Sequence, residues 1–202
     1  MMRRNNFPFS AVLGLNHAKT AILIVLVNPR AGGLLISGPR GIGKSTLMRS
    51  TQELIERPWR DIPVSVTEDR LFGTIDTEKA IYSGQKKLYP GIINEADQGV
   101  LYLDDANLLR EDLLDSILNI AEVGAYQLER DGLSLRCDTS FTVIAAINPE
   151  SGMLSGACLD QFGLFVNVDN IHDENTRVEI LKRTISFEKD CASFCNLWKL
   201  EN

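Results

Sequence analysis

The eight residues Gly38–Ser45 have the sequence GPRGIGKS and decide the fold of this 202-residue chain. They match the phosphate-loop pattern G-x-x-x-x-G-K-[ST] at every position. Glycines in such a loop let backbone N–H groups turn inward around phosphate oxygens, and the helix that follows adds the positive end of its dipole. Lys44 has the length to reach β- and γ-phosphates, and the Ser45 hydroxyl is suited to ligate Mg²⁺. The loop therefore predicts a nucleotide site.

The segments on either side of the loop support this interpretation over a chance glycine-rich turn. Leu34–Ser37 is apolar and predicts a short buried strand, whereas Ser45–Ile55 predicts a helix. A strand before the loop and a helix after it form the structural context that the motif requires.

Composition and charge limit the class of protein. Hydrophobic residues make up 44% of the sequence and charged residues 24%, which is typical of a globular domain. The net charge of −6 argues against a broad nucleic-acid-binding surface. The longest apolar run, Ala21–Val27, is far too short to span a bilayer, and no secretory apolar core follows the N-terminal arginines. We expect no membrane partner and an intracellular location, cytoplasmic or, in a photosynthetic eukaryote, the plastid stroma.

The rest of the chain alternates predicted strands with predicted helices, which indicates an α/β fold with a parallel sheet covered on both faces. Asn16–Val27 stays ambiguous between strand and helix. Asp131-Gly132 between two polar–apolar arms predicts a β-hairpin. The predicted strands are Ile62–Val66, Gly99–Leu103, Phe141–Ile147 and Phe165–Val168, and the predicted helices are Arg110–Val123 and Asp173–Thr184.

Three polar residues follow predicted strands at the edge where parallel sheets bind ligands. Asp104 ends the strand Gly99–Leu103 and is suited to hold the Mg²⁺ that bridges two phosphates. Asp105, the next residue, polarises the attacking water in one interpretation and caps the turn of residues 106–108 in the other. Asn148 orients water near the γ-phosphate in one interpretation and forms an Asn-Pro turn in the other.

With these residues assembled, the chain resembles the AAA+ motor subunits of magnesium chelatase, with the cobalt chelatase motor as a near relative. The likeness runs from Phe7 to the end of the chain. The segments that carry it, besides the phosphate loop, are Phe7–Gly14, Thr67–Ala80, Tyr89–Ile93, Gly99–Leu109, Glu129–Ser134 and Asn148–Gly152.

The resemblance implies a P-loop NTPase with an AAA+ core over residues 1–186, a helix-2 insertion at 67–98 and a β-hairpin insertion at 124–137. Residues 187–202 would begin the linker to a helical lid that this sequence does not contain. The cofactors would be ATP and Mg²⁺. The partners would be AAA+ chelatase subunits in a hexameric ring and a large porphyrin-binding subunit, and the ring would drive Mg²⁺ insertion into protoporphyrin.

The resemblance and the loop together give a set of site residues. Ser45 and Asp104 would hold the metal, Asp105 and Asn148 would act in catalysis, and the N-terminal segment would lie against the adenine. The residues predicted to contact the nucleotide are Val12, Leu13, Gly38, Pro39, Arg40, Gly41, Ile42, Gly43, Lys44, Ser45 and Thr46.

Two departures from the family pattern bear on turnover. Asp105 stands where the family usually has glutamate, and Gln161 stands where it has the arginine finger that enters the neighbouring subunit's site. A ligand misplacement of about 1 Å can cost about a hundredfold in rate, and loss of an arginine finger about 10³–10⁵. Two alternatives therefore stay open, namely a ring member that binds ATP but hardly hydrolyses it, and a remodelling ATPase of the MoxR type.

Overall fold

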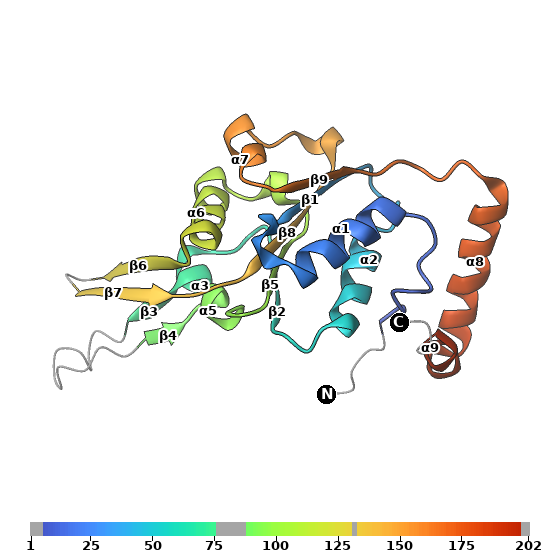
Figure 1. Cartoon of the computed structure of the whole chain (residues 1–202), viewed down its shortest axis with the longest axis horizontal. Coiled ribbons are helices and arrows are strands. Elements are labelled where there is room, and N and C mark those ends of the chain that lie inside the picture. Colours follow the sequence, from blue (N-terminus) through green and yellow to red (C-terminus); the bar gives the residue numbers. More distant parts are fainter. Residues whose placement is uncertain (1–5, 76–87, 131–132, 199–202) are drawn as a thin grey trace.

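The fold is built on a five-stranded sheet in which every strand pairing is parallel. A computed structural model describes residues 6–75, 88–130 and 133–198. The strand order is β2-β5-β8-β1-β9, which places the strand before the phosphate loop next to β8 (Figure 1). The strands are β1 (Leu34–Ser37), β2 (Trp59–Ile62), β5 (Val100–Leu103), β8 (Thr142–Ile147) and β9 (Leu164–Asn167).

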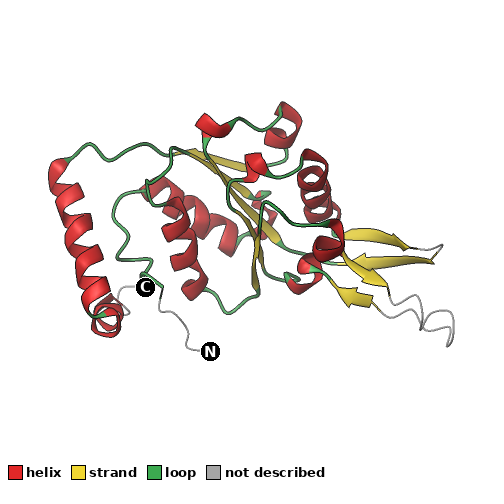
Figure 2. Cartoon of the chain, turned by 180° about the vertical axis from the view of Figure 1, so that it is seen from behind, coloured by secondary structure: helices red, strands yellow, loops and turns green. Residues whose placement is uncertain are grey.

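Helices cover both faces of this sheet, as the strand–helix alternation predicted (Figures 1 and 2). On one face, α1 (Asn16–Val27) and α2 (Lys44–Thr51) pack against side chains such as Ile36 and Ile144. On the other face, α6 (Glu111–Val123) packs against a second core that includes Leu101. The side chains of β1, β5 and β8 are all buried, because these central strands have a helix layer on each side.

The ambiguous segment Asn16–Val27 is a helix. Its buried residues, Ala18, Ala21, Ile22, Val25 and Leu26, recur with the spacing of a helical face and not with the alternation of a strand. The position of this segment in the fold explains why it is a helix, because it covers β1 and β9 instead of joining the sheet.

The predicted strand Ile62–Val66 is wrong in its position. The observed strand β2 is Trp59–Ile62 and pairs with β5, whereas Pro63 begins a turn closed by the Val66 N–H and the Pro63 carbonyl oxygen at 2.9 Å. Pro63 has no N–H to donate to a strand ladder, so the strand ends before it.

Both predicted insertions are present and contain antiparallel ribbons that project from the same end of the molecule (Figure 1). The predicted hairpin is β6 (Ala125–Arg130) with β7 (Leu133–Asp138), and its turn at 131–132 lies outside the described residues. Residues 67–98 contain short helices and a ribbon that the sequence did not predict. The elements there are α3 (Glu68–Phe72), β3 (Gly73–Ile75), β4 (Leu88–Pro90) and α5 (Ile92–Glu95), and residues 76–87 are not described.

The C-terminal part stands beside the sheet as α8 (Glu174–Lys189) and α9 (Cys191–Trp198) (Figure 1). The ring of Phe7 packs on the rings of Phe187 and Phe194 at centroid distances of 5.2 and 5.3 Å, so the N-terminal segment and this helix pair lie together. Helix α8 continues without a break past residue 186, and the proposed boundary there stays a prediction. The short helix α7 (Gly156–Asp160) was not predicted.

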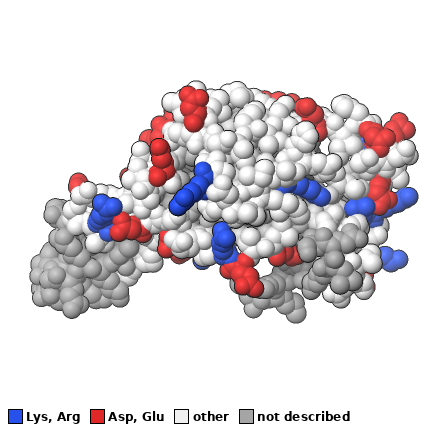
Figure 3. Space-filling model, viewed as in Figure 1, with Lys and Arg blue, Asp and Glu red and all other residues white. Residues whose placement is uncertain are grey.

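Short 3₁₀ turns complete the fold at Pro29–Ala31, Gln52–Leu54, Ala106–Leu108 and Pro149–Ser151. Within the described ranges, none of the helices has the length and apolar character needed to cross a membrane. Acidic and basic side chains mix over the face seen in Figure 3.

Candidate nucleotide and metal site

The phosphate loop lies between the end of β1 and the start of α2, as the sequence predicted. Gly41 and Gly43 have φ angles of 81° and 93°, in the left-handed region where a side chain would be strained. Gly38 is required for another reason, because a Cβ there would lie 2.5 Å from the carbonyl oxygen of Val168. The backbone of this loop therefore depends on its glycines at three points.

Lys44 is buried and folds back onto its own loop. Its ammonium donates hydrogen bonds to the carbonyl oxygens of Gly38 at 2.6 Å and Pro39 at 2.8 Å. Burial lowers the pKa of Lys44, and the negative charges of Asp105 and Asp104 oppose that shift. These two contacts hold the Lys44 amino group at the loop, where anionic phosphates would replace the weaker carbonyl partners.

Ser45 and Asp104 meet, although they are far apart in the sequence. The Ser45 hydroxyl donates to Asp104 Oδ2 at 2.9 Å. Strand order explains the contact, because β8 alone separates β1 from β5 and the carboxyl ends of parallel strands lie at one edge of the sheet. Two hard oxygen donors beside a phosphate loop fit Mg²⁺, which is usually held by one or two protein ligands together with substrate phosphates.

Among residues 6–75, 88–130 and 133–198, no three His, Cys, Asp or Glu side chains gather closely enough to hold a metal ion.

Tyr102 adds a residue that the sequence reasoning missed. Its side chain is 5% exposed, and its hydroxyl lies close to Asp104 and Ser45 without a well-formed hydrogen bond to any group. Burial, and then the negative charge of Asp104, raises the pKa of Tyr102. Strand alternation could have predicted that Tyr102 lies beside Asp104, because residues two positions apart along a strand and its extension share one face.

Asp105 has a left-handed backbone, with φ of 49°. Its side chain makes no hydrogen bond to cap the turn Ala106–Leu108, so the capping interpretation is wrong for the side chain. The backbone carbonyl oxygen of Asp105 instead accepts from the Leu108 N–H at 2.8 Å. The negative charge of Asp105 acts on Lys44, and a role of the carboxylate in polarising water stays a prediction.

Asn148 is 2% exposed and uses its amide within the turn that follows β8. Its Oδ1 accepts from the Glu150 N–H at 3.2 Å, and its Nδ2 donates to Ser151 Oγ at 3.2 Å. The amide therefore makes the contacts expected of an Asn-Pro turn. A role of Asn148 in orienting water stays a prediction.

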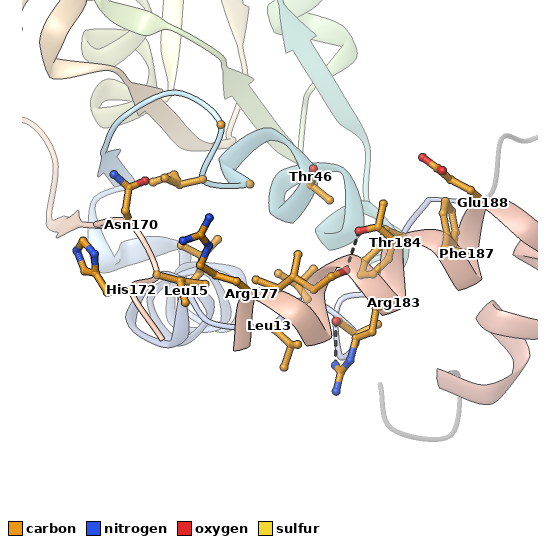
Figure 4. Close-up of a pocket in the computed structure, with 18 residues that line it drawn as sticks. Leu13, Leu15, Thr46, Asn170, His172, Arg177, Arg183, Thr184, Phe187 and Glu188 are labelled. Atoms are coloured by element: carbon orange, nitrogen blue, oxygen red, sulfur yellow. Dashed lines mark hydrogen bonds between the residues drawn. The ribbon is translucent and has the colours of Figure 1, made fainter. Parts of the chain in front are cut away.

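A pocket of about 790 Å³ opens beside the loop, between α2 and α8 (Figure 4). Arg177 and His172 line it from the C-terminal side, and Figure 4 shows Arg177 extending from α8 into the pocket. The predicted nucleotide contacts that line it are Val12, Leu13, Gly41, Ile42, Gly43 and Thr46. The other predicted contacts, Gly38, Pro39, Arg40, Lys44 and Ser45, belong to the loop and the α2 N-terminus at its edge.

Two cations hold the N-terminal segment against this pocket. Arg183 of α8 donates to the Ala11 carbonyl oxygen at 3.0 Å, and Lys19 of α1 donates to the Val12 carbonyl oxygen. Arg183 also stacks over the Trp198 ring at 4.4 Å. Burial, and then the charge of Arg183, lowers the pKa of Lys19. Sequence reasoning missed both residues, and for Arg183 the reason is that partners 172 positions apart carry no local signal.

Gln161 lies at the C-terminal end of α7, on the surface. Its Nε2 donates to the Ala157 carbonyl oxygen at 3.4 Å, which is a long contact within its own turn. The side chain is therefore available to a neighbouring molecule.

Comparison with known proteins places this geometry in a family. Residues 33–161 match the family described as AAA domain (dynein-related subfamily). The "Magnesium-chelatase 38 kDa subunit" of Cereibacter sphaeroides is 35% identical over 97% of this chain and 69% of its own length. The chain belongs to the AAA+ family of magnesium chelatase subunits.

Further members of this chelatase AAA+ family agree. The "Magnesium-chelatase subunit ChlI homolog" of Methanocaldococcus jannaschii is 33% identical over 96% of this chain and 63% of its own length. A solved complex between subunits BchI and BchD of magnesium chelatase contains a chain that matches with a TM-score of 0.77 and 35% identity, over 97% of this chain and 71% of that one. This chain therefore spans about two thirds of the length of its chelatase relatives.

Proposed function

We propose that this chain binds Mg·ATP and works as an ATP-driven AAA+ subunit of a magnesium chelatase-type complex, whose ring drives Mg²⁺ into protoporphyrin. The single observation that carries the proposal is the hydrogen bond between Ser45 and Asp104 at the mouth of the phosphate loop. It brings together the two metal ligands that the sequence predicted, in a chain 35% identical to a magnesium-chelatase subunit.

The residues of the loop have separate roles in this proposal. Lys44 exchanges its bonds to the Gly38 and Pro39 carbonyl oxygens for bonds to phosphate oxygens, because a charged acceptor binds an ammonium more strongly than a neutral carbonyl does. Ser45 and Asp104 hold the Mg²⁺. When bound, that ion neutralises charge that develops on the β- and γ-phosphates. Asp105 then orients and polarises the attacking water.

The pocket supplies the remaining contacts. Val12 and Leu13 provide apolar surface for the base, and the two cation contacts at Ala11 and Val12 fix that segment relative to α8. Arg177, which extends into the pocket from α8, is the side chain positioned to respond to the nucleotide from that wall. Because α8 and the loop face each other across one pocket, nucleotide binding would couple the C-terminal helices to the sheet.

Gln161 and Asp105 favour a second candidate, a ring subunit that binds ATP and hydrolyses it poorly by itself. A half-buried, neutral glutamine at the end of α7 cannot supply the charge of an arginine finger. This defect would act on the neighbouring subunit's site, so this chain's own site would still turn over beside a partner that carries arginine at that position.

One experiment tests both candidates. ATP hydrolysis is measured for the purified chain alone, and then mixed with an AAA+ chelatase subunit that has an arginine finger. The motor proposal expects slow hydrolysis alone, a large increase in the mixture, and ring-sized particles in the presence of ATP. A rate near zero in both samples, with Mg·ATP bound, would support the weakly hydrolysing candidate. Absence of Mg·ATP binding would contradict both candidates. Recovery of a very large porphyrin-binding protein with the tagged chain would favour a chelatase over a MoxR-type remodelling ATPase.

A further inference from the structure

The buried hydroxyl of Tyr102 has no function in the structure as it stands. Tyr102 is 5% exposed, and its hydroxyl oxygen is shielded from solvent and makes no well-formed hydrogen bond with any of the described residues. A phenylalanine would fill the same space without leaving a polar group unpaired. Buried polar groups in native proteins are nearly always paired, and a specific exception needs an explanation.

The ring of Tyr102 is fixed, so the position of its hydroxyl is fixed too. Its backbone lies in β5 between β2 and β8, where Tyr102 is opposite Asp61 on one side and Ile144 on the other. The ring packs against Trp59 with a centroid distance of 5.9 Å. The hydroxyl can therefore form a hydrogen bond as a donor only by rotating its hydrogen toward an acceptor.

The groups nearest to the hydroxyl are the two predicted metal ligands. Ser45 Oγ and the Asp104 carboxylate both lie beside it, and the Ser45 proton is directed at Asp104 Oδ2. The carboxylate has about four lone-pair directions and accepts one of the described hydrogen bonds, from Ser45. It therefore has room for a second donor.

We propose that Tyr102 is a positioning residue that donates a hydrogen bond to the Asp104 carboxylate when the site holds a Mg·nucleotide complex. The inference rests on the proposed function, because it assigns Asp104 to Mg²⁺. With Mg²⁺ bound, Ser45 and Asp104 would both be its ligands, and the Asp104 carboxylate would need a fixed orientation. A second donor on a rigid ring fixes the plane of that carboxylate, as partners behind metal ligands generally do.

The test compares Tyr102→Phe with wild type in three measurements on the whole chain. The first is the melting temperature without ligand. The second is a Mg²⁺ titration at fixed ATP, followed by the rise in melting temperature and repeated with Mn²⁺ observed by electron paramagnetic resonance. The third is ATP binding in EDTA. We expect Tyr102→Phe to melt at the same temperature as wild type or higher, because an unpaired hydroxyl is removed.

The same variant should need about tenfold more Mg²⁺ or Mn²⁺ for half of the effect, because a hydrogen bond to a charged acceptor is lost. Its ATP binding in EDTA should match wild type. A variant that keeps its stability but responds more weakly to the metal has lost a positioning contact. A packing defect would lower its stability as well.

Tyr126→Phe is the matched control. The Tyr126 hydroxyl hydrogen-bonds the Phe72 carbonyl oxygen at 2.7 Å and lies 2.6 Å from Asn94 Oδ1, outside the residues that form the phosphate site. This variant should lose stability and keep the wild-type metal midpoint.

Three outcomes would overturn the inference. An unchanged metal midpoint in Tyr102→Phe would do so, as would an equal loss of ATP binding with and without EDTA, because the effect would then come from packing. If wild type itself showed no metal-dependent stabilisation by ATP, the proposed function would fail and this inference with it.

Discussion

The phosphate-binding edge and the turnover positions of this molecule differ in how many of their expected residues are present. We use the term phosphate edge for the loop Gly38–Ser45 with Asp104, and turnover positions for Asp105, Asn148 and Gln161. At the phosphate edge, every expected residue is present and Lys44, Ser45 and Asp104 are already hydrogen-bonded. At the turnover positions, two residues depart from the family pattern and the third is engaged in its own turn.

From this difference we expect binding and hydrolysis to be separable at this site. Holding a triphosphate needs backbone geometry and a cation, which a single chain supplies. Hydrolysis needs a water placed to within about half an ångström and a charge from the neighbouring subunit. A single substitution can therefore change the phosphate edge or one turnover position without changing the other.

The largest expected effect is from Gln161→Arg. If this position faces the neighbouring subunit's site, restoring the finger should raise steady-state phosphate release from a homomeric assembly by about 10³ or more, with little change in ATP affinity. The surface position accepts arginine without burying a charge. Gln161→Lys is the control, since lysine restores the charge without the planar fork and should give a smaller gain. Unchanged phosphate release in both variants would place the finger elsewhere.

Asp105→Glu tests the carboxylate on this chain's own side of the site. The extra methylene moves the carboxylate by about 1 Å, and we expect hydrolysis to rise by about 10² with ATP binding unchanged. A small loss of stability should accompany the gain, because aspartate tolerates the left-handed backbone at φ 49° better than glutamate does. Asp105→Asn keeps the backbone preference and should hydrolyse at the background rate. Equal rates for Asp105→Asn and wild type would show that this side chain is not the base.

Lys44→Ala tests the phosphate edge itself. At an ATP concentration of about 100 Kd, a bound nucleotide stabilises the wild-type chain by about 2.7 kcal/mol, and this stabilisation should be lost with the ammonium. Lys182→Ala on the exposed surface of α8 is the control for removing one positive charge. A melting shift that survives in Lys44→Ala would contradict the site assignment, and calorimetric titration with ATP would confirm the result independently.

The sequence predicted those parts of the molecule whose function requires particular residues in consecutive order. The loop, the strand before Asp104 and the hairpin at 124–137 were all found correctly, because glycine, carboxylate and turn residues mark them locally. The contact between Ser45 and Asp104 was also predictable, since strand order in a parallel sheet brings them to the same edge, whereas their binding of a metal stays a prediction.

The parts that could not be predicted depend on contacts between distant segments. The position of β2 was wrong because an edge strand with exposed Arg60 and Asp61 lacks an apolar signal, and Pro63 appeared to lie inside it. The short helix α7 has no periodicity over its five residues. The bond from Arg183 to the Ala11 carbonyl oxygen joins positions that no local pattern relates.

The smallest effect is expected at Asp173, which caps the helix that forms the far wall of the pocket. Its Oδ2 accepts from the Thr176 hydroxyl at 2.6 Å and from the Thr176 N–H at 2.7 Å. The Thr176 side-chain bond, and then the backbone bond, lowers the pKa of Asp173 below its usual value. The ionised cap therefore stabilises the folded chain above the ordinary aspartate pKa, and this contribution is lost as the pH falls through the lowered pKa.

Asp173→Ala should lower the melting temperature by about 2–4 °C near neutral pH, and the difference from wild type should narrow as the pH falls through the lowered pKa of Asp173. Asp173→Asn keeps an acceptor for Thr176 without a titrating group, so it should melt near wild type at neutral pH and show a shallower loss in acid. Thermal melts across pH measure both. Because α8 only closes the pocket that the loop forms, ATP binding should weaken much less in Asp173→Ala than in Lys44→Ala. An equal loss of binding in the two variants would mean that the wall, and not the phosphate edge, holds the nucleotide.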